Sequence, residues 1–257
     1  AWVKAEYTNQ NLATNFYSVG HVKEWNASDW TAYDKLTIKS GAVEEDLTDF
    51  PVYVDLSDLS TSFWNTVADD GADIRITTDS GSLTELPREI VSVNTTNNLG
   101  ELHFKANSIS SSTDTTFRIY YNGTTTPDYN GSHRYGSEQV WTNGYAGVWH
   151  MEEDPTVGIS DSTSYRNNAT AYGSMTSADV VDAGMGKGID FDGSDDYLDC
   201  SAAVPVLTTS FTMSAWVDFD MADDYEAAIS FYKSDTEYLA MGSDPSGNYK
   251  LFTSGET

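Results

Sequence analysis

The chain has 257 residues, and its 40 acidic against 13 basic side chains give a formal net charge of −27. A surface this acidic repels phosphates, which excludes nucleic acid as a partner. A single cysteine, Cys200, excludes an intrachain disulfide, and no apolar run reaches the roughly 18 residues of a membrane span. The length suffices for two domains with separate cores.

Residues 1–30 form an irregular N-terminal arm. We expect a short strand over residues 1–7 and a polar loop over residues 9–15. The arm holds too many aromatic residues for a solvated tail, namely Trp2, Phe16, Tyr17, Trp25 and Trp30. It therefore packs either on its own domain or, as an added strand, on a neighbouring subunit.

From Tyr33 onward, short alternating stretches separated by Asn and Gly turns predict β-strands. The expected strands cover residues 35–38, 52–56, 73–77, 85–91, 99–105 and 115–121, with one helical turn within residues 60–67. Short strands at this spacing favour a sandwich or a barrel.

Four motifs in this region occur in a fixed order: LTIKSGAVEEDLTDFPVYVDLSD, DGADIRITTDSG, LPREIVSV and TTFRIYYNGT. In that order, residues 31–124 resemble the domain family of unknown function DUF2341, which often precedes laminin-G-like modules in long surface proteins. The resemblance implies a domain of an extracellular or virion-surface protein and assigns no activity.

Residues 125–140 are rich in Thr, Gly and Asn, which predicts a linker. The remaining residues, 141–257, read as a second β-domain. Strands are expected over residues 188–191 and 197–200 on either side of an acidic turn, and over residues 211–217, where large apolar residues alternate.

The motifs GVWHMEE, DSTSYRNNATA, GKGIDFDGSDDYL and SFTMSAWV follow one another in this second region. They resemble the laminin-G-like, concanavalin A-like jelly-roll domains of secreted bacterial, archaeal and phage proteins. The expected fold class is therefore all-β, with two consecutive antiparallel, jelly-roll-like sandwiches after the N-terminal arm. A jelly roll of this type needs more strands than residues 145–257 supply, so we expect a longer chain or a neighbouring subunit to complete it.

Two oxygen-rich segments, residues 161–168 and 192–196, offer the hard ligands that calcium takes. The resemblance to jelly rolls that bind calcium near one edge implies Asp161, Asn167 and Asp192 as ligands. The alternative is that these residues only form turns in an acidic protein.

His150 lies beside Glu152 and Glu153, a combination that suits metal binding or acid–base chemistry. The other histidines, His21, His103 and His133, show no recognised ligand spacing, so a structural role is favoured for His150. Adjacent carboxylates on a strand point to opposite faces, and no catalytic motif is present. We therefore expect no enzyme.

Sequons for N-glycosylation are also present. They begin at Asn26, Asn94, Asn122, Asn130 and Asn168. Several would arise by chance in a chain rich in Asn and Thr.

Together these features predict a non-enzymatic structural or adhesive subunit of an extracellular or virion-surface assembly, such as a filament, a surface layer or a capsid or tail decoration. Its partners would be copies of itself or other surface proteins. The alternative is a carbohydrate-binding module in which exposed tyrosines such as Tyr225, Tyr232 or Tyr238 stack on sugars. A polysaccharide hydrolase is a second alternative, for which no suitable carboxylate pair is found.

Overall fold

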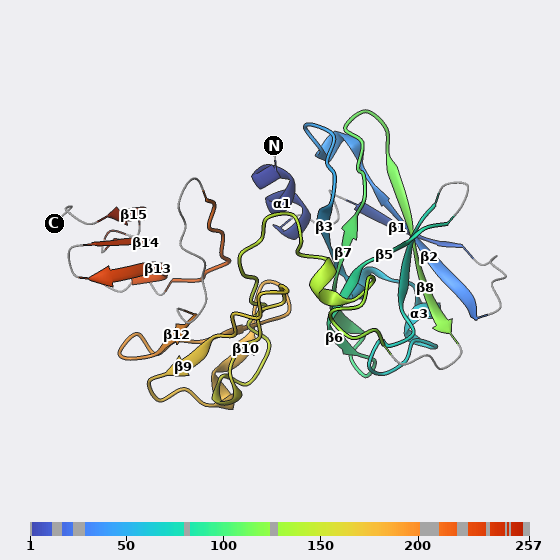
Figure 1. Cartoon of the computed structure of the whole chain (residues 1–257). Coiled ribbons are helices and arrows are strands. Elements are labelled where there is room, and N and C mark those ends of the chain that lie inside the picture. The colour runs from blue at the N-terminus through green and yellow to red at the C-terminus, as the bar shows by residue number, and fades with distance from the viewer. Residues whose placement is uncertain are drawn as a thin grey trace. The chain divides into compact units, whose positions relative to one another are not determined.

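The computed structural model describes residues 2–11, 17–22, 29–79, 83–123, 128–200, 211–219, 226–234, 237–244, 246 and 248–253. The chain divides into two compact units, residues 1–204 and residues 205–257. In both units the described strands pair antiparallel, which confirms the all-β prediction (Figure 1). No described helix is long and apolar enough to cross a membrane.

The first unit contains a five-stranded and a three-stranded sheet. The five-stranded sheet has the order β1 (Tyr17–Val22), β2 (Trp30–Ile38), β8 (Thr115–Gly123), β4 (Arg75–Thr78) and β5 (Glu85–Leu86). The three-stranded sheet has the order β3 (Phe50–Asp55), β7 (Leu99–Ala106) and β6 (Arg88–Asn94). Five of the six predicted strands of this region are present, with ends shifted by a few residues. The strand predicted over residues 85–91 is instead divided into β5 and β6, which belong to different sheets.

The two sheets share one hydrophobic core. Side chains alternate along a strand, so Leu102 and Phe104 of β7 point inward, as does Phe117 of β8. The rings of Phe104 and Phe117 meet across the core with their centroids 5.0 Å apart. Each fully buried side chain of this size contributes about 1.5–3 kcal/mol to stability. The first unit therefore contains a sandwich-like body.

The predicted helical turn is present as α3 (Thr61–Trp64), preceded by the 3₁₀ turn η2 (Leu56–Asp58). Ser60 caps α3, because its hydroxyl accepts a hydrogen bond from the Phe63 amide. Buried Asp34 in turn accepts hydrogen bonds from the Ser60 amide and the Tyr121 hydroxyl. These bonds fix the loop between β3 and β4 to the five-stranded sheet.

The N-terminal arm is more regular than the sequence indicates. Residues 2–11 form the helix α1 (Trp2–Asn11), so the strand predicted over residues 1–7 is wrong. Ala5 and Asn9 are buried, and their spacing of four residues places them on one helical face. β1 then pairs with β2 along its whole length, so the arm adds its strand to its own domain and not to a neighbour.

The described part of the predicted linker packs on the sandwich-like body. The Arg88 guanidinium forms an ion pair with Asp128 at 2.6 Å, and Val140 is fully buried. Residues 124–127 lie outside the described residues. After this segment come two small hairpin-like sheets, which pair β9 (Thr170–Tyr172) with β12 (Tyr197–Asp199) and β10 (Val180–Asp182) with β11 (Lys187–Ile189).

This later part of the first unit is thinly packed. None of the described residues 170–200 is buried, although several large apolar side chains are among them. Tyr172, Phe191 and Tyr197 are each more than two fifths exposed. The strands predicted around the acidic turn exist, but each is only three residues long.

The second unit is a three-stranded sheet of β13 (Glu226–Ser234), β14 (Glu237–Ser243) and β15 (Tyr249–Thr253). The Asp244 carboxylate accepts hydrogen bonds from the amides of Ser246 and Asn248 and so organises the turn between β14 and β15. Residues 211–219 are not a strand, which corrects the prediction for residues 211–217. They pair with no described strand, and without a ladder an alternating apolar sequence alone does not make a strand.

Candidate functional site

A row of polar side chains crosses the outer face of the three-stranded sheet. The strand register places Tyr53 of β3 and Glu89 of β6 on either side of His103 of β7. Glu101 lies two residues before His103, so both point away from the core that Leu102 enters.

This outer face is covered by the chain that follows the sandwich-like body. The His103 ring lies with its centroid 5.1 Å from that of Trp141 and 4.9 Å from that of His150. As a result His103, Glu101 and Glu89 are only 3%, 5% and 8% exposed. A buried charge is costly unless it is paired, so the pairing of these groups decides whether the arrangement is stable.

The carboxylates and imidazoles pair in a chain. His103 Nε2 lies 2.8 Å from Glu101 Oε1, and His150 Nδ1 lies 3.5 Å from the same oxygen. His150 Nε2 lies 3.1 Å from Glu89 Oε2, to which Trp141 Nε1 donates a hydrogen bond of 2.5 Å. His150 thus joins the carboxylates of two adjacent strands.

The pKa values follow from this pairing. Burial by itself lowers the pKa of His150, but hydrogen bonds with Glu101 and Glu89 outweigh it and raise this pKa to about 10. Burial raises the pKa of Glu101, but its bonds with His103 and His150 lower it to about 2. Burial likewise raises the pKa of Glu89, but its hydrogen bonds with His150 and with the Ser162 hydroxyl outweigh this effect and lower the pKa.

A third carboxylate, that of Glu152, approaches the cluster. Burial and the charge of Glu101 raise its pKa above the ordinary value. Both carboxylates converge on Gly186, where an added Cβ would collide with Glu152 Oε1 and meet Glu101 Oε2 at 2.6 Å. Gly186 has a φ of +53°, so the chain has a second reason for glycine at this position.

The side chains of Glu101, His103 and His150 each offer one ligand atom, and these atoms lie within 4.8 Å of one another. Two imidazoles and one carboxylate are a ligand set suited to a divalent transition metal. The sequence alone does not predict this cluster, since His103 and His150 are far apart in the chain. The available signal was the alternation of Glu101 and His103 with Leu102 and Phe104 on a buried strand.

Two of the predicted calcium ligands, Asp161 and Asn167, do lie together. The Asp161 carboxylate accepts hydrogen bonds from the amides of Val148, Thr163 and Asn167 and from the Thr163 hydroxyl. The Asn167 side chain donates to the Ala146 carbonyl oxygen. In the structure these groups therefore organise a buried loop.

Asp192, the third predicted ligand, lies in the acidic turn. Its carboxylate accepts hydrogen bonds from the amides of Ser194 and Asp195, and it forms a group with exposed Asp195 and half-buried Asp196. The structure describes no contact between Asp192 and Asp161. Calcium binding at these residues stays a prediction.

The sequons differ in what the structure describes of them. Asn94, Asn122, Asn130 and Asn168 are exposed, and Asn26 lies outside the described residues.

Of the tyrosines expected to stack on sugars, Tyr225 lies outside the described residues, whereas Tyr232 and Tyr238 are opposite each other in the ladder of β13 and β14.

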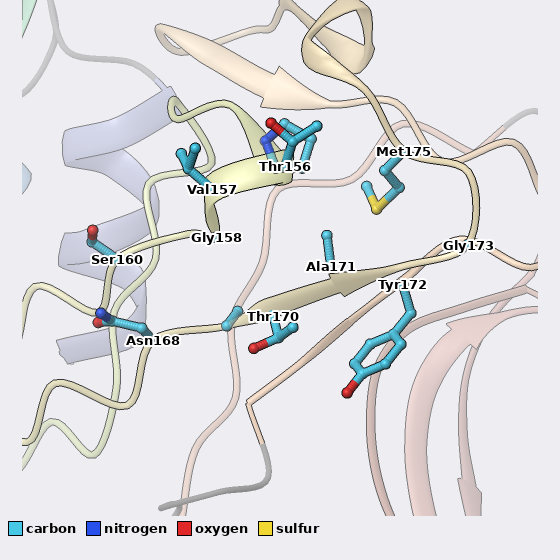
Figure 2. Close-up of a pocket in the computed structure, with 12 residues that line it drawn as sticks. Thr156, Val157, Gly158, Ser160, Asn168, Thr170, Ala171, Tyr172, Gly173 and Met175 are labelled. Atoms are coloured by element: carbon cyan, nitrogen blue, oxygen red, sulfur yellow. The ribbon is translucent and has the colours of Figure 1, made fainter.

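A cavity of about 370 Å³ lies between the 3₁₀ turn η4 (Pro155–Val157) and β9 (Figure 2). No carboxylate or imidazole is among its described lining residues. The Tyr172 ring lies on the opposite side of β9 from Ala171 and stacks on Tyr197, with centroids 4.9 Å apart and planes 7° apart. Both rings are about half exposed.

No protein-family model, curated protein or solved structure matches the chain.

Proposed function

We propose that the protein is a non-enzymatic structural or adhesive subunit of an extracellular or virion-surface assembly, whose partners are copies of itself or other surface proteins. The observation that carries the proposal is the thin packing of the later half of the chain. None of the described residues in 170–200 and 211–219 is buried, whereas the sandwich-like body has a full core.

Apolar side chains in the thinly packed segments gain free energy when another surface covers them. Tyr172, Phe191 and Tyr197 belong to the first unit, and Tyr249 and Leu251 belong to β15 of the second. At about 25 cal/mol per Å² of apolar area, covering several such side chains supplies the driving force for association. The edges of the three-stranded sheet of the second unit pair with no further described strand, so their backbone groups could pair with a strand from another chain.

The resemblances to DUF2341 over residues 31–124 and to laminin-G-like jelly rolls over residues 141–257 support a location at a cell or virion surface. Within this proposal, residues 141–257 form the second jelly-roll-like sandwich only when an added chain completes it. Calcium at Asp161, Asn167 and Asp192 and glycans on the exposed sequons would fit the same setting.

The net charge of −27 opposes association between copies. At about 0.15 M salt the Debye length is about 8 Å, so charges on neighbouring copies are largely screened. We therefore expect assembly to be weak in low salt and to strengthen with ionic strength or divalent cations.

Sedimentation of the Phe191→Asp variant tests the proposal. Phe191 is 44% exposed in the thinly packed segment, so a charge there should abolish assembly at screening salt. Leu99→Asp is the matched control, because Leu99 is 55% exposed on the well-packed body and should assemble like the wild type. A wild-type protein that stays monomeric at all salt and protein concentrations would refute the proposal.

A carbohydrate-binding module is the second candidate, favoured by the exposed, stacked pair of Tyr172 and Tyr197 beside a largely polar cavity. Binding to a glycan array should then be lost in Tyr172→Ala and kept in Tyr7→Ala, which removes a similarly exposed ring from α1. Equal binding by both variants would exclude this pair as the sugar platform.

A further inference from the structure

We propose that Glu101, His103 and His150 bind one zinc ion, with Glu89 as the carboxylate that orients His150 from outside the coordination sphere. The site would fasten the chain around residue 150 to the outer face of β7. This inference is independent of the proposed assembly.

The separations of the ligand atoms fit such an ion. Zinc binds nitrogen and oxygen at about 2.0–2.2 Å, so two ligand atoms of a tetrahedral site lie roughly 3.3–3.5 Å apart. Glu101 Oε1 lies 2.8 Å from His103 Nε2 and 3.5 Å from His150 Nδ1. These two distances bracket the required value, and the ligand atoms of the two imidazoles lie within 4.8 Å of each other.

The surroundings of His150 fit a metal ligand as well. A ligating histidine almost always donates its second ring N–H to a carboxylate or carbonyl group. His150 directs Nδ1 at Glu101 and Nε2 at Glu89, whose carboxylate also accepts the hydrogen bond from Trp141. The Glu89 carboxylate is therefore held in place to orient His150.

The charges also favour a cation. The described ion pairs of Glu89 and Glu101 all go to His103 and His150, and Glu152 adds a third carboxylate to the same buried region. A divalent ion would displace the proton of His150 into solvent, which leaves one more positive charge in the cluster to offset the excess negative charge. Glu152 or a water molecule would complete the fourth position.

A cavity lies beside the cluster, on the side of Glu89. Glu89 lines a cavity of about 270 Å³ together with Ser160 and Ser162. The two imidazoles distinguish this site from the exposed acidic turn, where Asp192, Asp195 and Asp196 offer oxygen alone. Imidazole suits zinc, and an oxygen-only set suits calcium.

Zinc titration of the metal-free full chain against a chromophoric chelator tests the site. One zinc per chain is expected, and excess calcium should not displace it. Cobalt in place of zinc should give the intense visible absorption of a tetrahedral centre. Absence of saturable binding at one ion per chain would overturn the proposal.

Variants assign the ligands. His150→Gln should abolish the tight binding, whereas His133→Gln and Asp195→Asn should bind like the wild type. If circular dichroism shows that His150→Gln is unfolded, the zinc affinity of Glu89→Gln tests the site instead. This variant keeps all three ligands but loses the carboxylate that orients His150, so it should bind zinc about 10–100-fold more weakly. Unchanged affinity in a folded His150→Gln, or in Glu89→Gln, would contradict the assignment.

Discussion

The pairing of His150 with two buried carboxylates predicts a large loss of stability in His150→Gln. In the metal-free protein, the substitution leaves Glu89 and Glu101 without their shared cationic partner. Removing one member of a buried ion pair costs about 3–5 kcal/mol. In the variant, Trp141 still donates a hydrogen bond to Glu89 and His103 still contacts Glu101. We therefore expect a loss at the lower end of this range, about 3 kcal/mol.

Urea unfolding in the presence of a chelator, followed by tryptophan fluorescence, measures this loss. His133→Gln is the control, because His133 takes part in none of the described ion pairs, unlike His150. It stacks on Tyr129 with ring centroids 4.1 Å apart and accepts a hydrogen bond from the Tyr135 amide. The free energy of unfolding of His133→Gln should fall by less than about 1 kcal/mol. A loss below about 1 kcal/mol for His150→Gln, or equal losses for both variants, would refute the reasoning.

Three further predictions concern stability. Leu102→Ala should lower the free energy of unfolding by about 2–5 kcal/mol in urea denaturation, since Leu102 is fully buried; a loss below about 1 kcal/mol would contradict the core assignment. Gly186→Ala should cost about 1–3 kcal/mol in the same assay, because the new Cβ is strained at φ +53° and meets two carboxylates; a neutral result would contradict the described contacts. Burial, reinforced by the charge of Asp58, raises the pKa of Tyr17. Above about pH 10 the unfolded chain releases the Tyr17 proton, whereas the folded protein keeps it. The free energy of unfolding is therefore unaffected by Tyr17 below about pH 10 and decreases as the pH rises above it. Tyr17→Phe should flatten this alkaline fall in urea midpoints, and an unchanged fall would exclude Tyr17 as its source.

The sandwich-like body was the most predictable part of the chain. Its strands alternate over enough residues to show a period of two, as Leu102, Phe104 and Ala106 do in β7. α1 was missed because its apolar pattern is weak: among the α1 side chains that the structure describes, the two buried ones are Ala5 and Asn9. The strand predicted over residues 211–217 has the correct alternation but no described strand to pair with.

The candidate metal centre could not be predicted from the sequence. His103 and His150 lie 47 positions apart, and only the packing of the chain after Trp141 onto the outer face of β7 brings them together. Alternation along β7 does predict that Glu101 and His103 share a face. It does not predict that this face is buried, because the covering segment has no regular secondary structure.

Hydrogen–deuterium exchange of the thinly packed segments tests the central claim most directly. Residues 170–200 and 211–219 should exchange rapidly in the monomer at low salt and become protected when the protein assembles at higher salt, while β7 stays protected in both. Rapid exchange of these segments in the assembled protein, or protection already in the monomer, would contradict the claim that another chain completes this half.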